Sequence, residues 1–133
     1  MSEEIRNLRM ETSVARDFFA KNLAYTLGPV ELKEMIEENK VKLIDVRADE
    51  DYNISHIPNS VSMPYEKIKE DLLNNKIELS KEDINVVYCY NNLCHLGDRA
   101  AYKLADAGYP VMVMQGGFKS WTEDSHFAVI SEK

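Results

Sequence analysis

Cys94 lies in a polar stretch between an apolar run and a segment rich in helix-forming residues, where a thiol can act as a nucleophile. The apolar run at residues 86–89 has no helical period and contains two β-branched residues, which predicts a buried strand. Residues 100–107 predict a helix, which Gly108 and Pro110 end. Backbone N–H groups and the positive end of the dipole stabilise an anion at the start of a helix. A thiolate in this place is therefore a better nucleophile than a free thiol with a pKa of about 8.5.

The second cysteine, Cys89, lies at the end of the predicted strand. A loop cysteine before a helix is exposed and activated, whereas a strand-end cysteine tends to be buried and inert. We therefore assign Cys94 as the nucleophile, and the alternative is that Cys89 attacks while Cys94 packs. A third hypothesis, based on nearness in sequence alone, is that Cys89 resolves an oxidised Cys94 as a disulfide.

Short predicted strands alternate with predicted helices along most of the chain, which indicates an α/β fold. We expect one domain with a mostly parallel central sheet and helices on both of its faces. Gly28 and Pro29 open a helix, since proline is favoured at the first helical position. The other predicted helices span 65–73 and 100–107, with a helical turn from Ser80 and a last short helix from Phe118. The predicted strands are 41–46, 60–63, 86–89 and 111–114.

Residues 1–27 form an N-terminal extension that precedes the domain predicted for residues 28–133. Residues 1–10 are polar and are expected to be loosely held. A helix is predicted from Thr12 or Ser13 to about Tyr25, because either residue is a good N-cap. We favour an interpretation in which this helix covers the sheet, and the alternative is a dimer surface. The apolar residues on one half of this helix are Val14, Phe18, Phe19 and Leu23.

Four motifs, in order and spacing, resemble those of the rhodanese family of small α/β sulfurtransferase domains. Together they extend from Gly28 to Trp121. They are Leu43-Ile44-Asp45-Val46-Arg47, Asp51-Tyr52-x-x-Ser55-His56-Ile57-Pro58-Asn59-Ser60, Cys94-x-x-Gly97-x-Arg99-Ala100 and Gln115-Gly116-Gly117-Phe118-x-x-Trp121.

The resemblance implies a two-step reaction at Cys94. The thiolate attacks the sulfane sulfur of a small donor, either thiosulfate or a persulfide, and a thiol or protein acceptor then takes the sulfur from the Cys94 persulfide. Arg99 is expected to orient the donor anion or to fix the loop. The backbone N–H groups expected to cradle the persulfide belong to His95, Leu96, Gly97, Asp98, Arg99 and Ala100.

Asp45 and Arg47 follow a predicted strand at the edge where open α/β sheets place their sites. We interpret them as a charge pair that supports the site, because charges buried at strand ends are usually paired. By the resemblance, the acid that pairs with Arg47 is Asp51. His56 is read as a satisfied supporting residue. No cofactor and no metal is expected, since no second His or Cys stands at ligand spacing.

Three departures from the family pattern concern the site and one turn. Residues 90–94 look like an insertion between the strand and the catalytic loop. Ser55 and Asn59 stand where the pattern has glycine, and Asn59 still tolerates a positive φ. Asp98 places a negative charge beside Arg99, so a dianion such as thiosulfate receives less electrostatic help.

The net charge of −7 argues against nucleic acid or an anionic membrane as a partner. No apolar stretch approaches membrane-spanning length, and the charged residues 1–9 do not form a signal peptide. Two cysteines close together are not a disulfide framework, which favours the cytoplasm. The chain is expected to be a monomer or a weak homodimer. The alternative to an enzyme is a non-catalytic binding or regulatory module of the same fold.

Overall fold

A parallel five-stranded sheet forms the centre of the computed structural model, which describes residues 2–74, 79–91 and 93–131. The strand order is β1-β6-β5-β2-β4, and every neighbouring pair is parallel. The fold confirms the predicted α/β class. The strands are β1 (Thr26–Leu27), β2 (Val41–Asp45), β4 (Ser60–Ser62), β5 (Ile84–Tyr88) and β6 (Val111–Met114).

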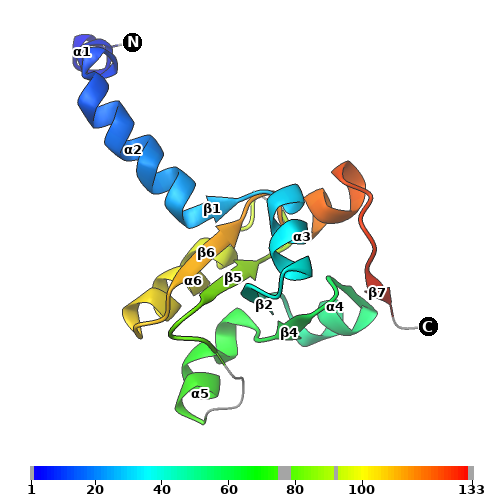
Figure 1. Cartoon of the computed structure of the whole chain (residues 1–133). Coiled ribbons are helices and arrows are strands. Elements are labelled where there is room, and N and C mark those ends of the chain that lie inside the picture. Colours follow the sequence, from blue (N-terminus) through cyan, green and yellow to red (C-terminus); the bar gives the residue numbers. More distant parts are fainter. Residues whose placement is uncertain (1, 75–78, 92, 132–133) are drawn as a thin grey trace.

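Alternate residues of the central strands enter two separate cores, one on each face of the sheet. Leu43 and Val86 pack with Leu32 of α3 (Pro29–Glu37), whereas Ile44 and Val87 pack with Leu104 of α6 (Leu96–Asp106). Figure 1 shows α3 in front of the sheet and α6 behind it. This two-residue period on strands that are buried on both faces is typical of a parallel sheet between helices.

The remaining helices are short. Tyr65–Lys67 forms a 3₁₀ turn (η1) that leads into α5, in place of the single helix predicted for 65–73. A π-helical turn (η2, Ser120–Asp124) follows α7. The α-helices of this group are α4 (Asp49–Ile54), α5 (Ile68–Leu73) and α7 (Gly117–Lys119).

The register brings the carboxyl ends of three strands to the same edge of the sheet. Asp45 at the end of β2 is paired with Tyr88 of β5 on one side and with Ser62 of β4 on the other. Cys89 follows directly after β5 at this edge. The residues that end these strands therefore lie at the same edge as Cys89, where open α/β sheets place their sites.

Two helices, α1 (Glu3–Met10) and α2 (Thr12–Tyr25), form an arm that projects from the sheet (Figure 1). Within the segment 1–10, which we expected to be loosely held, Ser2 caps α1 by accepting a hydrogen bond from the N–H of Ile5, and no residue of α1 is buried. The interpretation that α2 covers the sheet is wrong, since no residue of α2 is buried and Phe18 is 63% exposed. The sheet faces are already covered by other helices. Glu11, not Thr12 or Ser13, is the N-cap residue of α2.

Several local predictions differ from the structure. Helix α6 begins at Leu96, four residues before the predicted start, so that Gly97 and its neighbours belong to the first helical turn. Ser80 accepts hydrogen bonds from the N–H groups of Glu82 and Asp83 and makes a turn without a helix. The rest of that predicted connection includes residues 75–78, which lie outside the described residues, as does residue 92 of the predicted insertion.

The C-terminal segment adds a small sheet that the sequence pattern did not indicate. β7 (Ile130–Ser131) pairs antiparallel with β3 (Ser55–His56). β1 likewise lies within the predicted extension at 1–27, yet it belongs to the main sheet through its pairing with β6. Within the described ranges, no helix is long and apolar enough to cross a membrane.

Candidate functional site

The two cysteines are joined by a disulfide bond between the end of β5 and the start of α6. Their Cα atoms are 6.6 Å apart. Cys89 is 6% exposed, whereas Cys94 is half-buried and more accessible to a small molecule. The structure therefore brings together the two residues that we considered as alternative nucleophiles. They form the Cys89–Cys94 disulfide of the third hypothesis.

The backbone around Cys89 is held by the segment that begins α7. The carbonyl of Cys89 accepts a hydrogen bond of 2.9 Å from the N–H of Phe118, and the carbonyl of Tyr90 accepts one of 2.8 Å from Lys119. Gly117 has a φ of +60°, and a Cβ atom there would lie 2.5 Å from the Tyr90 carbonyl group. Only glycine fits this approach, so the Gly-Gly motif fixes the backbone that carries Cys89.

The residues predicted to form a catalytic loop after Cys94 are the N-cap and first turn of α6. His95 is the N-cap residue, and its side chain makes no capping hydrogen bond. The first helical bond that follows it runs from the N–H of Arg99 to the carbonyl of His95, over 3.0 Å. The preceding amides have no intrahelical acceptor, as at any helix start, and this end of α6 follows Cys94 and His95 directly in the chain.

The side chains of this turn separate into two groups. Gly97 and Ala100 are buried, and Gly97 lies against β6, where an added Cβ would be 3.4 Å from Val113. Asp98 and Arg99 are exposed. Arg99 is not among the described residues that line either cavity beside Cys94. The expected role of Arg99, to orient the donor anion or to fix the loop, stays a prediction.

Both cysteines line a cavity of about 520 Å³. This volume lies within the range of roughly 300–1,000 Å³ that is usual for small-molecule sites. Among its described lining residues, the cationic side chain is Arg47, and the carboxylates are Asp51 and Glu66. The apolar and aromatic side chains of the lining include Val46, Ile54, Pro64, Tyr65, Leu96 and Phe118.

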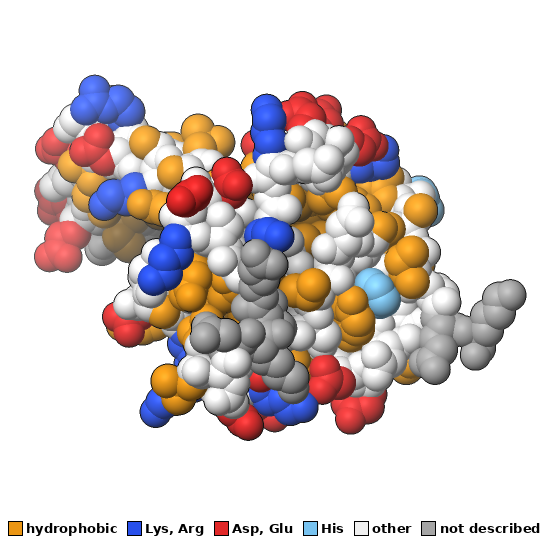
Figure 2. Space-filling model, turned by 60° about the horizontal axis from the view of Figure 1, so that its bottom comes forward, with side chains coloured by type: hydrophobic (Ala, Val, Ile, Leu, Met, Phe, Trp, Pro, Cys, Tyr) orange, Lys and Arg blue, Asp and Glu red, His pale blue; other side chains and the backbone are white. Residues whose placement is uncertain are grey.

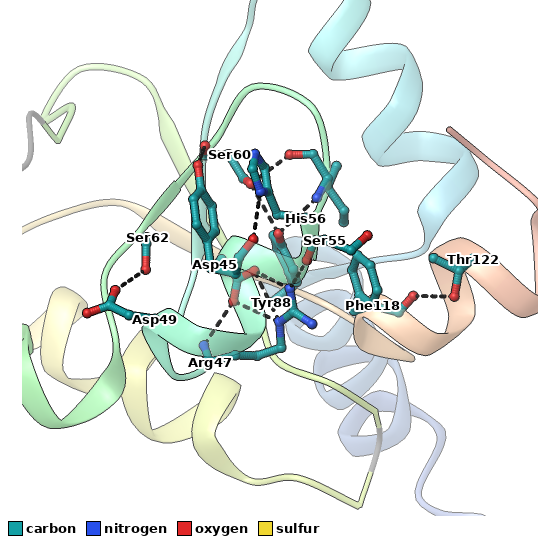
Figure 3. Close-up of polar contacts among 12 residues, drawn as sticks. Asp45, Arg47, Asp49, Ser55, His56, Ser60, Ser62, Tyr88, Phe118 and Thr122 are labelled. Carbon is teal, nitrogen blue, oxygen red and sulfur yellow. Dashed lines mark hydrogen bonds and ion pairs between the residues drawn. The ribbon is translucent and has the colours of Figure 1, made fainter. Parts of the chain in front are cut away.

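Arg47 is engaged by Asp45, as Figure 3 shows. Its Nη2 atom donates to Asp45 Oδ2 over 2.7 Å and to the carbonyl of Ser55 over the same distance. Its guanidinium carbon lies 4.2 Å from the centre of the Phe118 ring. Burial opposes the charged form of Arg47, but the hydrogen bonds and charge of Asp45 raise the pKa of Arg47 above its usual value.

The predicted charge pair is therefore present, but its acid is Asp45 and not Asp51. Asp45 lies two residues before Arg47 and accepts from both its backbone N–H and its side chain. Asp51 remains close enough for its charge to favour ionised Arg47. The bond from Arg47 to Ser55 joins the strand end to the segment that precedes His56, as the supporting role requires.

Tyr88 is a supporting residue that sequence reasoning placed only in a strand. Its ring is fully buried, and its hydroxyl donates to Ser60 Oγ over 3.1 Å and accepts from the N–H of Ile57. Burial, together with the nearby Asp45 charge, raises the pKa of Tyr88 well above its usual range. A tyrosine at the end of a buried strand was the available signal, because a buried hydroxyl needs partners.

His56 and Asn59 occupy supporting positions near the same strand ends. The ring of His56 stacks on Tyr52 with centroids 3.8 Å apart, and its Nδ1 lies 2.8 Å from the Tyr52 carbonyl oxygen. Asn59 has a φ of +71°, which confirms that it makes the turn where the pattern has glycine. Across residues 2–74, 79–91 and 93–131, no three His, Cys, Asp or Glu side chains are grouped as a metal site.

Comparisons with known proteins agree with this arrangement. Residues 28–124 match the family model described as the rhodanese-like domain. The crystal structure of BH2092 from Bacillus halodurans is 30% identical, with a TM-score of 0.81, over 91% of this chain and 87% of that chain. The thiosulfate sulfurtransferase GlpE of Coxiella burnetii is 28% identical over 96 residues, covering 71% of this chain and 84% of GlpE.

Two other relatives are much longer than this chain. The HTH-type transcriptional regulator Rv0324 of Mycobacterium tuberculosis is 31% identical over 91 residues, which cover 68% of this chain and 38% of the regulator. The adenylyltransferase and sulfurtransferase UBA4 of Candida albicans is 33% identical over 99 residues, covering 68% of this chain and 22% of UBA4. The chain thus spans well under half the length of either protein.

Proposed function

Because the chain belongs to the rhodanese-like domain family, we propose that it is a sulfurtransferase that carries a sulfane sulfur on Cys94. The observation that carries this proposal is the position of Cys94. It lies before the N-terminus of α6, at the carboxyl edge of the sheet, and it lines a cavity of small-molecule size. The free amides of the first turn of α6 favour an anion beside them, either the attacking thiolate or the persulfide formed from it.

The reaction starts from the reduced enzyme, in which a thiol has opened the Cys89–Cys94 disulfide. The Cys94 thiolate attacks the outer sulfur of the donor, and the bond from that sulfur to the rest of the donor breaks. The donor leaves with the electron pair, as a thiolate or, from thiosulfate, as sulfite. An acceptor thiolate then attacks the outer sulfur of the Cys94 persulfide and returns Cys94 to the thiolate.

The lining of the cavity favours a donor with an apolar body and little negative charge. Arg47 is already neutralised by Asp45, and the two carboxylates, Asp51 and Glu66, oppose a dianion. The exposed Arg99 lies outside the lining. We therefore propose that an organic persulfide, and not thiosulfate, is the preferred donor, with a thiol or a protein thiol as acceptor in the reducing cytoplasm.

The α1–α2 arm supports a weak homodimer within this proposal. Residues 1–25 carry four Lys or Arg and four Asp or Glu, so the arm has no net charge and the remaining residues carry the −7. Figure 2 shows charges of both signs mixed with hydrophobic side chains on the arm. Two arms can therefore pair without the net repulsion that two acidic domains experience.

The test compares two donors in sulfur transfer to a thiol acceptor. Benzenethiosulfonate is a monoanion with an aromatic body, and thiosulfate is a small dianion. We expect kcat/KM to be about tenfold higher for benzenethiosulfonate, which corresponds to about 1.4 kcal/mol of transition-state binding. Cys94→Ser should abolish transfer from both donors. No transfer by the wild type from either of these donors, nor from an organic persulfide, would leave the binding module as the function.

Glu66→Gln tests the electrostatic part of this argument. Removing a carboxylate from the cavity lining should raise kcat/KM for the thiosulfate dianion more than for the monoanion. Glu70→Gln is the matched control, since Glu70 is exposed on α5 and does not line the cavity. Equal effects of the two substitutions on thiosulfate would contradict the proposed charge preference.

A further inference from the structure

Cys89 has no role in the transfer reaction, although its sulfur lies within bonding reach of Cys94. We propose that Cys89 attacks the Cys94 persulfide and releases the outer sulfur as hydrosulfide, which makes the chain a two-cysteine reductase of sulfane sulfur. This inference rests on the proposed function, because it needs sulfur to be loaded on Cys94. It goes beyond transfer, because no external acceptor takes the sulfur.

The chemistry of this step balances within the two cysteines. The Cys89 thiolate attacks Sγ of Cys94, and the bond between that Sγ and the outer sulfur breaks. The outer sulfur leaves with the electron pair and is protonated to hydrosulfide, while the Cys89–Cys94 disulfide forms. The sulfane sulfur thereby gains two electrons, and the two cysteine thiols lose them. A dithiol reductant then opens the disulfide by exchange and is itself oxidised to a disulfide.

The different exposure of the two cysteines suits these roles. Cys94 is half-buried and lines both cavities at the site, so a donor can reach it. Cys89 also lines both cavities but is only 6% exposed, which keeps the sulfur of a bulky donor out of its reach. A nearly buried thiol beside the nucleophile can act on a sulfur bound there before an external thiol arrives.

The backbone holds both cysteines in place for this reaction. The Cys89 carbonyl accepts from the N–H of Phe118, and Gly117 packs against the same carbonyl. The N–H of Cys94 donates to the carbonyl of Asn91 over 3.1 Å. Gly97 of α6 lies beside the strand end, where an added Cβ would be in van der Waals contact with Cβ of Cys89 at 3.9 Å. The positions that form the disulfide are thus fixed by backbone contacts.

The experiment loads sulfur in the absence of any other thiol. The full chain is reduced, freed of reductant and mixed without oxygen with one equivalent of benzenethiosulfonate. Hydrosulfide is measured as its bimane derivative, and the protein is alkylated and weighed by intact mass spectrometry. The wild type should release close to one equivalent of hydrosulfide and lose both alkylatable thiols. Cys89→Ser should retain one added sulfur and release none, and Cys94→Ser should do neither.

Each other outcome has a defined meaning. A wild type that keeps the added sulfur as stably as Cys89→Ser overturns the inference but leaves the sulfurtransferase intact. Equal hydrosulfide release by the wild type and Cys89→Ser also overturns it, because Cys89 is then not required. If Cys89→Ser takes up no sulfur, the proposed function fails as well. Cys89→Ala is run in parallel, because a buried serine hydroxyl can disturb folding where alanine does not.

Discussion

At the scale of single residues, the site depends on a cluster of buried polar side chains at the carboxyl ends of β2 and β5. Asp45 binds Arg47, Arg47 binds the Ser55 carbonyl, and Tyr88 lies beside both with its hydroxyl on Ser60 (Figure 3). Buried charges of this kind remain only when they are paired and hydrogen-bonded. Arg47 therefore acts as a support for the cavity wall and the strand ends, and it is not a free cation for an anionic donor.

Tyr88 should make the fold sensitive to alkaline pH. Its pKa is raised in the folded protein, so its contribution to stability is complete below pH 10, about the pKa of an unfolded tyrosine, and decreases as pH rises above this value. The expected loss from Tyr88 is about 1 kcal/mol between pH 10 and 11. Tyr88→Phe should lower the free energy of unfolding at pH 8, because the Ile57 N–H loses its acceptor, but should reduce the alkaline loss.

Urea unfolding at pH 8 and pH 11 measures this effect. Part of the alkaline loss should persist in Tyr88→Phe, since burial and the Asp45 charge also raise the pKa of Tyr52. Tyr102→Phe is the control, because Tyr102 is 75% exposed on α6. A fall in stability that is the same in wild type, Tyr88→Phe and Tyr102→Phe would show that Tyr88 is not responsible.

At the scale of elements, three segments position the cysteines. β5 ends at Tyr88, α6 begins at Leu96, and the N–H groups of α7 bind the carbonyls of Cys89 and Tyr90. Gly117 allows α7 to approach the strand end, because an added Cβ there would lie 2.5 Å from the Tyr90 carbonyl group. This glycine therefore decides how closely α7 encloses the cysteine segment.

Gly117→Ala should damage both stability and sulfur transfer. The substitution meets a φ of +60° and places Cβ 2.5 Å from the Tyr90 carbonyl group, so we expect a loss of about 3 kcal/mol. Gly108→Ala is the matched control, because its φ is +91° but nothing lies within 4 Å of the added Cβ. It should lose about 1 kcal/mol and keep full kcat/KM. Equal losses in the two variants, by urea unfolding and donor assay, would contradict this role of Gly117.

Much of this arrangement could be predicted from sequence, and the exceptions have physical reasons. The apolar runs identified the main strands, and the motifs placed Asp45, Arg47 and Cys94 near one edge. The start of α6 was set too late, because a glycine and polar residues in a first turn look like a loop. Two-residue strands such as β1, β3 and β7 carry no pattern long enough to recognise. Their pairing depends on contacts that are distant in sequence.

At the scale of the whole molecule, the α1–α2 arm lies outside residues 28–124, which match the rhodanese-like domain. Its apolar residues remain exposed, and the match to BH2092 covers 91% of this chain, which extends beyond residues 28–124. Phe18→Glu should abolish the proposed weak homodimer, as measured by sedimentation velocity over a range of concentrations. Ala20→Glu adds the same charge to the other half of α2 and should leave association unchanged. A wild type that sediments as a monomer at every concentration would contradict the dimer.

The central claim, that Cys94 carries the sulfur, is tested most directly by intact mass and peptide mapping after anaerobic loading with benzenethiosulfonate. Cys89→Ser is the informative protein, because it cannot resolve its persulfide internally. The account predicts one added sulfur (about 32 Da) on the peptide that contains Cys94, and no added sulfur in Cys94→Ser. Sulfur found on Cys89 in Cys94→Ser, with none taken up by Cys89→Ser, would contradict the account and move the nucleophile to the strand end.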